Sequence, residues 1–211
     1  MARPRSDIQK RVIHAARTRF LAEGVDGASL RRIARAARTS IGMVYYYFPT
    51  KDDLFLAVVE DVYVVFLADL VLALEPSLPV EERILRLYRR IGAVTGNERL
   101  ILRLVLREAL VSSARLDRIV ERFQRGHLPL MLQVVSDGLT QGTFDTSIHP
   151  LVVFLSLMAL GGPGQLVRRI TEGRSPFPDS PSGAELSAQM LRILLHGVGA
   201  KPPEVSHEVR A

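Results

Sequence analysis

The chain of 211 residues contains no cysteine, which excludes disulfide scaffolds, thiolate metal sites and cysteine nucleophiles. Its five histidines do not show the spacing of a metal-binding motif such as HExxH, and no glycine-rich phosphate loop follows a strand pattern. We therefore expect no metal site, no cofactor and no enzymatic activity.

Long uninterrupted apolar runs are also missing. Residues 54–74 are apolar but contain Glu60, Asp61 and Asp69, and the apolar run 151–160 is about half as long as a membrane span requires. The N-terminus is basic and lacks the apolar segment of a signal peptide. These absences predict a soluble, cytoplasmic protein that does not act at a membrane.

Positive charge is concentrated at the N-terminus. Residues 1–51 contain eleven Lys and Arg against three acidic residues, a net charge of +8, whereas residues 52–211 contain seventeen basic and nineteen acidic residues, a net charge of −2. A basic module joined to a nearly neutral remainder is typical of a protein that binds a polyanion. The alternative is a basic surface that is simply solvated.

Almost every segment of the chain has the apolar periodicity of a helix. In the N-terminal part the predicted helices are 7–23, 30–37, 40–47 and 51–74. Gly24 suits the end of the first helix, while Ser29, Ser40 and Thr50 suit the starts of the next three. The second and third helices are joined by a tight turn, which makes a helix-turn-helix candidate inside the basic segment.

Larger helices are predicted for the remainder, at 80–94, 98–112, 115–140, from about 148, and 184–197. Residues 98–112 are apolar nearly all round, which predicts a central, buried helix. Gly126 and Pro129 are expected to kink or split the helix 115–140. The sequence Gly-Gly-Pro-Gly at 161–164 interrupts the next helix, and residues 173–183 are predicted to form a loop.

One ungapped pattern within residues 10–60 is made by Ala16, Phe20, Gly24, Ser29, Leu30, Ile33, Ala34, Ser40, Gly42, Tyr45, Phe48, Lys51 and Leu54. In this pattern the segment resembles the N-terminal domain of the TetR family of bacterial transcriptional regulators. Two positions depart from the family pattern, since Arg38 replaces the usual glycine of the turn and Thr39 replaces an apolar residue. A positive φ at Arg38 would cost about 1 kcal/mol, and we expect the turn to form nevertheless.

The helical pattern and the resemblance together predict an all-α fold. A three-helix, homeodomain-like helix-turn-helix domain occupies residues 1–51, and the fourth helix, 51–74, connects it to the rest. A larger helical domain for ligand binding and dimerisation covers residues 52–200, and residues 201–211 form a disordered tail.

The resemblance also implies which residues contact DNA, because the second helix of such a pair enters the major groove. The groove-facing candidates are Ile41, Gly42, Met43 and Tyr46, and Arg31 is the candidate for a guanine contact. Phosphate contacts are expected from Ser29, Ser40, Tyr46, Tyr47 and Lys51. Val44, Tyr45 and Phe48 are expected in the core, and the spacing of Ile41 fits either role.

For the second domain the resemblance implies a ligand pocket and a dimer interface. The pocket candidates are Arg103, Arg107, Phe123, His127, Met131 and Phe154. The two arginines would bind an acidic ligand or pair with Glu98 or Glu108, and His127 would line a pocket or lie in the core. The dimer candidates are Val152, Leu155, Met158, Leu186, Met190, Ile193 and Leu194, which would otherwise pack within one subunit.

The resemblance therefore implies a homodimeric, cytoplasmic transcriptional repressor. We expect it to bind a palindromic double-stranded DNA operator and to be released by a small-molecule effector whose identity the sequence does not reveal. The alternative is a constitutive or architectural DNA-binding protein that has no effector.

Overall fold

The computed structural model describes residues 7–170 and 179–196, so the predicted tail 201–211 and most of the predicted loop 173–183 lie outside it. In the described residues all regular structure is helical, which confirms the all-α prediction. The helices of the N-terminal end are α1 (Asp7–Gly27), α2 (Leu30–Ala36), α3 (Ile41–Tyr47) and α4 (Lys51–Ala73). The others are α5 (Val80–Gly92), α6 (Gly96–Val111), α7 (Ser113–Gln124), α8 (His127–Thr140), α9 (Pro150–Gly161), α10 (Pro163–Ile170) and α11 (Gly183–His196).

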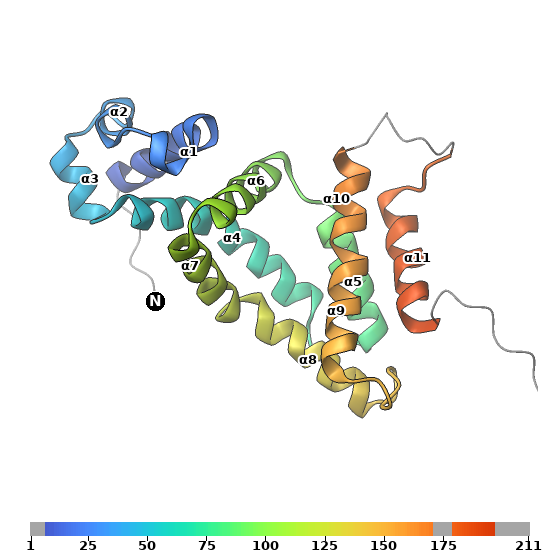
Figure 1. Ribbon diagram of the computed structural model, residues 1–211. Helices are drawn as coiled ribbons and strands as arrows, with labels where there is room; N and C mark the ends of the chain where they lie inside the picture. Colours follow the sequence, from blue (N-terminus) through green and yellow to red (C-terminus); the bar gives the residue numbers. More distant parts are fainter. Residues whose placement is uncertain (1–6, 171–178, 197–211) are drawn as a thin grey trace, which may run out of the picture.

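Helices α1, α2 and α3 form one end of the molecule, with α3 outermost in Figure 1. Gly24 has φ 78° inside α1, so the first long helix breaks at the predicted glycine and one further turn leads to Gly27. The core of this end is made by α1, α2, α3 and the start of α4, where Phe20 packs edge-to-face on Phe55 at 6.5 Å between ring centroids. The same core also contains Ile101, Leu104, Val105 and Ile119 of α6 and α7.

Helix α4 joins the two hydrophobic cores of the chain. Its first half contributes Leu54 and Val58 to the core described above, whereas Leu70 and the following Leu74 belong to a second core around α5, α8 and α9. Thr50 and Asp53 form a capping box that fixes the start of α4. One continuous helix therefore enters both cores.

The second core packs α5 against α8, α9 and α11. Tyr88 is completely buried there and its hydroxyl donates a 3.0 Å hydrogen bond to the carbonyl oxygen of Leu157. Burial raises the pKa of Tyr88 well above its ordinary value. Helices α10 and α11 lie side by side at this end of the molecule (Figure 1).

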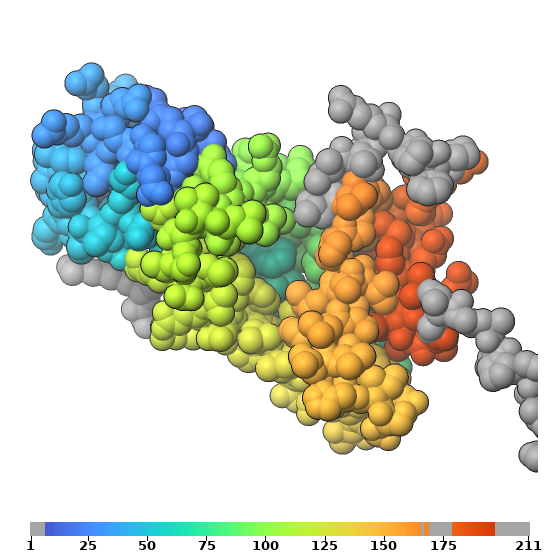
Figure 2. All heavy atoms as spheres, viewed as in Figure 1, coloured from blue at the N-terminus to red at the C-terminus, as the bar shows by residue number. Residues whose placement is uncertain are grey.

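Two helix predictions have different outcomes. The helix predicted for 115–140 is split between α7 and α8 next to Gly126, as expected. The prediction of a buried helix at 98–112 is wrong, because α6 buries one face only and exposes Leu106 (52%) and Leu110 (91%). Its buried face contacts α1, α4 and α7, while Figure 2 shows the surface hollowed between α6 and α9, with α4 at the floor.

Candidate nucleic-acid interface and ligand site

Helix α3 presents one side to the core and the other to solvent. Val44 is completely buried, and Ile41 packs partly against the same core. On the outer side Gly42 is exposed and Tyr46 is 76% exposed, with its ring edge-to-face on Tyr47. The outer face therefore combines a position without a side chain and a protruding aromatic ring.

The expectation that Tyr45 belongs to the core is wrong, since its side chain is 52% exposed while Phe48 is 4% exposed. The spacing 41, 44, 48 describes the inner side of this short helix better than 44, 45, 48. Residues three and four positions apart share one face of a helix, so 41, 44 and 48 define the buried side and Tyr45 lies at its edge.

Polar side chains border α3 at the starts of three helices. The side chain of Ser40 accepts a 3.2 Å hydrogen bond from Met43 N, whereas Ser29 occupies the N-cap of α2 without a side-chain cap bond. Arg31 is exposed. Lys51 begins α4, and its Nζ donates a 2.9 Å hydrogen bond to the carbonyl oxygen of Asp26. None of the nine residues predicted to contact DNA is buried.

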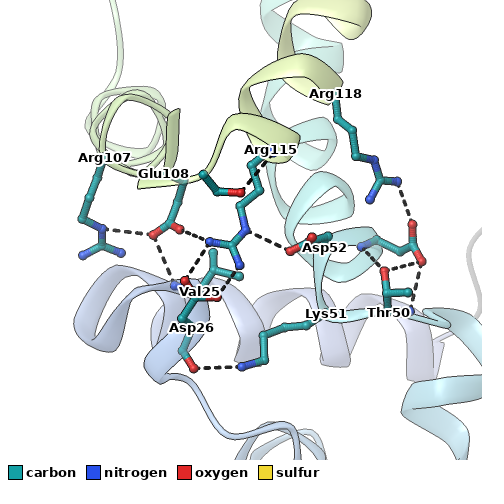
Figure 3. A network of polar contacts seen from close by, with 11 residues as sticks. Val25, Asp26, Thr50, Lys51, Asp52, Arg107, Glu108, Arg115 and Arg118 are labelled. Atoms are coloured by element: carbon teal, nitrogen blue, oxygen red, sulfur yellow. Dashed lines mark hydrogen bonds and ion pairs between the residues drawn. The ribbon is translucent and has the colours of Figure 1, made fainter. Parts of the chain in front are cut away.

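A polar junction, drawn in Figure 3, ties this end of the molecule to α6 and α7. We use the name polar junction for Asp26, Asp52, Glu108 and Arg115. Arg115 of α7 is 6% exposed and donates to Asp52 at 2.9 Å, to Glu108 at 2.8 Å and to both carboxylate oxygens of Asp26. One guanidinium thus joins the end of α1, the start of α4 and α6.

The contacts of the polar junction shift the pKa values of Asp26 and Arg115. The hydrogen bond and charge of Arg115 hold the pKa of Asp26 below its ordinary value, and the same contact raises the pKa of Arg115. Glu108 is 3% exposed and also accepts a 3.2 Å hydrogen bond from the backbone N of Val25. All three carboxylates therefore face a fixed positive charge.

Next to the junction, Asp53 accepts a 2.7 Å hydrogen bond from Arg118. Its pKa is lowered by the hydrogen bond from Thr50 and then by that from Arg118. Further along the same pair of helices, Arg122 donates to both carboxylate oxygens of Glu60, at 2.6 and 2.7 Å. Helix α7 is thus ion-paired to α4 at three successive levels.

The six pocket candidates do not come together in one place. Arg107 lies beside the junction, where it donates to Glu108 and to the carbonyl oxygen of Phe20. Arg103 is exposed. Met131 and Phe154 belong to the second core, the first buried and the second packed at its edge. Phe123 lines a pocket between α4 and α7, and its ring lies 4.9 Å from that of His127.

That hollow, the α4–α7 pocket, has a volume of about 390 Å³ and lies between the two helices that the ion pairs join. It is lined by Leu56, Ala57, Val59, Glu60, Ile119, Arg122 and Phe123. Sequence reasoning found Phe123 alone. The helical spacing of 56, 59 and 60 and of 119, 122 and 123 marks two faces, but nothing in a single sequence states that these faces meet.

Tyr63 connects the pocket to the break between α7 and α8. Its hydroxyl accepts the backbone N–H of His127 at 3.2 Å and lies 2.7 Å from Nδ1 of the same residue. Burial, and then the charge of Arg122, lowers the pKa of His127. Nδ1 of the neutral ring can therefore accept a hydrogen bond from the Tyr63 hydroxyl. Gly126 permits this approach, because a Cβ there would overlap the Tyr63 oxygen.

Comparison with known proteins identifies the helix-turn-helix end of the molecule. The model of the family "Bacterial regulatory proteins, tetR family" matches residues 12–58, which run from α1 into α4. Residues 12–58 thus form a DNA-binding domain of the TetR family of transcriptional regulators. The resemblance seen in residues 10–60 is thereby confirmed.

Three similar proteins place this chain among its relatives. The HTH-type transcriptional regulator YhgD of Bacillus subtilis (strain 168) is 22% identical over 155 residues, covering 72% of this chain and 79% of YhgD. The HTH-type transcriptional repressor NicS of Pseudomonas putida is 36% identical over 55 residues, 26% of each chain. The structure of FadR from Bacillus subtilis in complex with stearoyl-CoA has a TM-score of 0.70 and 15% identity, over 90% of this chain and 99% of FadR; it shows a shared fold.

The dimer candidates of the chain occupy two different environments. Val152, Leu155 and Met158 lie on the outer side of α9 and are 50%, 54% and 36% exposed. The four candidates on α11 are partly buried, and two of these, Met190 and Leu194, pack against the second core of the same chain. The apolar face of α9 is therefore open, whereas α11 is partly used within the subunit.

Two kinds of feature are absent from the described residues, a metal-binding cluster and a membrane-spanning helix. Among residues 7–170 and 179–196 there is no group of three histidines or acidic residues arranged to hold a metal ion. Over the same residues no helix is long and apolar enough to cross a bilayer.

Proposed function

We propose that this regulator is a homodimeric repressor that binds a palindromic operator through α3 and is released when a small molecule binds its second domain. The observation that carries the proposal is the course of α4. This helix begins at Lys51, beside α3, and reaches the second core at Leu70. A shift of α4 caused by a bound effector would therefore move the start of this helix relative to α3.

The proposed contacts divide by type. Gly42 allows close approach of the backbone to bases, Met43 and the exposed part of Ile41 contact thymine methyl groups, and Arg31 pairs with guanine. Ser29, Ser40, Tyr46, Tyr47 and Lys51 contact phosphates, which sets the position of α3 without reading sequence. Ser40 retains a hydroxyl proton for this purpose, since its cap bond uses it only as an acceptor.

Dimerisation follows from the operator. Two half-sites about one helical turn apart need two recognition helices, and the open apolar face of α9 supplies a surface for the partner. Replacing Leu155 with Glu is expected to give monomers in sedimentation equilibrium. Leu132→Glu on α8, at a site of 49% exposure, is the matched control and is expected to remain dimeric.

The effector is proposed to act through the α4–α7 pocket, whose volume of about 390 Å³ lies within the range of small-molecule sites. FadR, which shares this fold, forms a complex with stearoyl-CoA, and this supports a small-molecule effector for the present chain. Full release requires the ligand to prefer the released conformer by about 5.5 kcal/mol. A constitutive DNA binder is the alternative, and the pocket weighs against it because such a protein needs no hollow.

Fluorescence anisotropy with the DNA upstream of the regulator's own gene tests the DNA-binding surface, with Tyr47→Ala and Lys51→Ala measured alongside. We expect tight, sequence-selective binding and a salt slope that falls by about one unit for Lys51→Ala. Arg125→Ala removes an equal charge from an exposed pair on α7 and is expected to leave the slope unchanged. Binding that is equal on unrelated DNA and unaffected by both variants would contradict the proposed surface.

A further inference from the structure

A second hollow lies on the DNA-binding end, between the outer side of α1 and the turn that follows α2. It is lined by Lys10, Arg11, His14, Ala15, Thr18, Arg19, Ala36 and Arg38. We call it the α1 basic hollow. None of its residues is among the predicted DNA contacts, which lie on α3 and at the starts of α2 and α4.

The lining contains four Lys or Arg side chains and a histidine but no carboxylate. Two of the four cations are compensated by acidic residues of α1 itself, Arg11 by Asp7 and Arg19 by Glu23. Lys10 and Arg38 are exposed, and neither side chain has a hydrogen bond or an ion pair with another residue of the described chain. The hollow therefore carries two uncompensated positive charges.

The backbone conformation at position 38 disfavours any residue that has a side chain. Arg38 has φ 53°, the left-handed region in which glycine is preferred, and a side chain there costs about 1 kcal/mol. The turn is fixed by hydrogen bonds from the N–H groups of Arg38 and Thr39 to the carbonyl oxygens of Arg35 and Ala34. The fold thus uses the backbone of residue 38 but makes no use of its guanidinium.

Along the chain, the α1 basic hollow borders the proposed reading surface. Arg38 lies two residues before Ser40, the N-cap of α3. Arg11 Nε donates a 3.0 Å hydrogen bond to the carbonyl oxygen of Ala37, which holds α1 against the turn. A DNA duplex seated on α3 would extend past this turn, and its phosphates are the anions that two unpaired cations in an acid-free hollow attract.

We propose that the α1 basic hollow binds the DNA phosphate backbone beside the half-site, with Arg38 and Lys10 as the contacting side chains. The proposal rests on the proposed function in that DNA is the partner, and it adds a contact surface outside α3. Because phosphates carry no sequence information, this surface strengthens binding to the operator and to unrelated DNA by the same factor.

The test compares Arg38→Gly and Lys10→Ala with the parent by anisotropy, on the operator and on a random duplex, over a series of salt concentrations. Each variant is expected to bind both duplexes several-fold more weakly, with the salt slope reduced by about one unit and the operator preference unchanged. Arg38→Gly relieves the positive φ, so its Tm is expected to equal or exceed that of the parent, which excludes misfolding as the cause. Arg125→Ala is the control of equal charge.

Three results would overturn the proposal. Unchanged slopes in both variants, with Lys51→Ala still impaired, would show that the α1 basic hollow lies away from DNA while the proposed function stands. Loss of operator preference in Arg38→Gly would show that Arg38 reads bases. Absence of DNA binding by the parent protein on any duplex would remove both the hollow's partner and the proposed function.

Discussion

Lys51 and Asp26 are joined by a 2.9 Å hydrogen bond from the ammonium group to the backbone carbonyl oxygen, and the side chain of the same Asp26 is held by Arg115. Lys51, which is proposed to contact DNA, and Arg115 of α7 therefore both donate hydrogen bonds to Asp26 (Figure 3). Arg115 also binds Asp52, next to Lys51, so one side chain of α7 contacts both the end of α1 and the start of α4. This contact connects the proposed ligand site to the proposed DNA surface.

Replacing Arg115 with Leu is expected to lower the free energy of unfolding by about 3 kcal/mol, because buried Glu108 loses its buried partner and keeps only the half-exposed Arg107. Urea unfolding measures the loss. Arg115→Lys keeps the charge but cannot reach three carboxylates at once, so an intermediate loss is expected. A loss below about 1 kcal/mol for Arg115→Leu would mean that the junction behaves as an exposed ion pair.

The pair formed by Arg83 and Asp137 predicts an acid sensitivity. Arg83 is 1% exposed, donates to Asp137 at 2.5 Å, and leaves its Nε and second terminal nitrogen without a partner in the described chain. That contact holds the pKa of Asp137 below its ordinary value of 3.8. Since the folded state has the lower pKa, the stabilisation is complete above about pH 4 and is lost as the pH falls through the folded value.

We therefore expect Asp137→Asn to be less stable than the parent at pH 7, and the difference to shrink between pH 4 and pH 2. Thermal unfolding at closely spaced pH values measures both curves. Asp145→Asn, at an exposed turn, serves as the comparison. A difference between Asp137→Asn and the parent that stays constant to pH 2 would show that the ionisation of Asp137 does not stabilise the fold.

The break between α7 and α8 predicts a coupled pair of substitutions. Gly126→Ala places a Cβ on the Tyr63 hydroxyl and is expected to cost about 1–3 kcal/mol. Tyr63→Phe removes that oxygen but leaves the N–H of His127 without its acceptor. In the double variant the overlap with the Tyr63 oxygen is gone and only the 3.1 Å contacts with Arg122 remain, so the two losses should be less than additive in urea unfolding. Strict additivity would contradict the close packing at this break.

Filling the α4–α7 pocket should separate ligand response from DNA binding. Ala57 lines the pocket, and Ala57→Leu is expected to occupy part of it while leaving α3 untouched. A thermal-shift panel that includes stearoyl-CoA and free fatty acids identifies compounds that raise the Tm of the parent. Such a compound should fail to stabilise Ala57→Leu and fail to release it from DNA. Equal stabilisation of both proteins would place the ligand elsewhere.

The local features of the sequence predicted much of the fold. The cap formed by Thr50 and Asp53, the break at Gly24 and the split at Gly126 all depend on residues adjacent in the chain. The polar junction does not, because Arg115 and Asp26 are 89 residues apart. A charged residue has many possible partners at such a separation in sequence. Only the position of α7 beside α1 and α4 in the fold determines that Arg115 pairs with Asp26 and Asp52.

The error over α6 has a related cause. An apolar periodicity tells how much of a helix avoids water, but not what is present to cover it. Leu106 and Leu110 lie on the side that α1, α4 and α7 leave open in one chain. Tyr45 shows the same limit on a smaller scale, since α3 is too short for the pattern to distinguish the two sides of the buried face.

The central claim is that a dimer of this chain reads two symmetric half-sites with α3. Selection of bound sequences from a pool of random duplexes tests it most directly. The account predicts enrichment of an inverted repeat whose half-sites are about one helical turn apart, and loss of that enrichment for Leu155→Glu and Tyr47→Ala. Enrichment of a single, unrepeated site, or of no sequence at all, would contradict it.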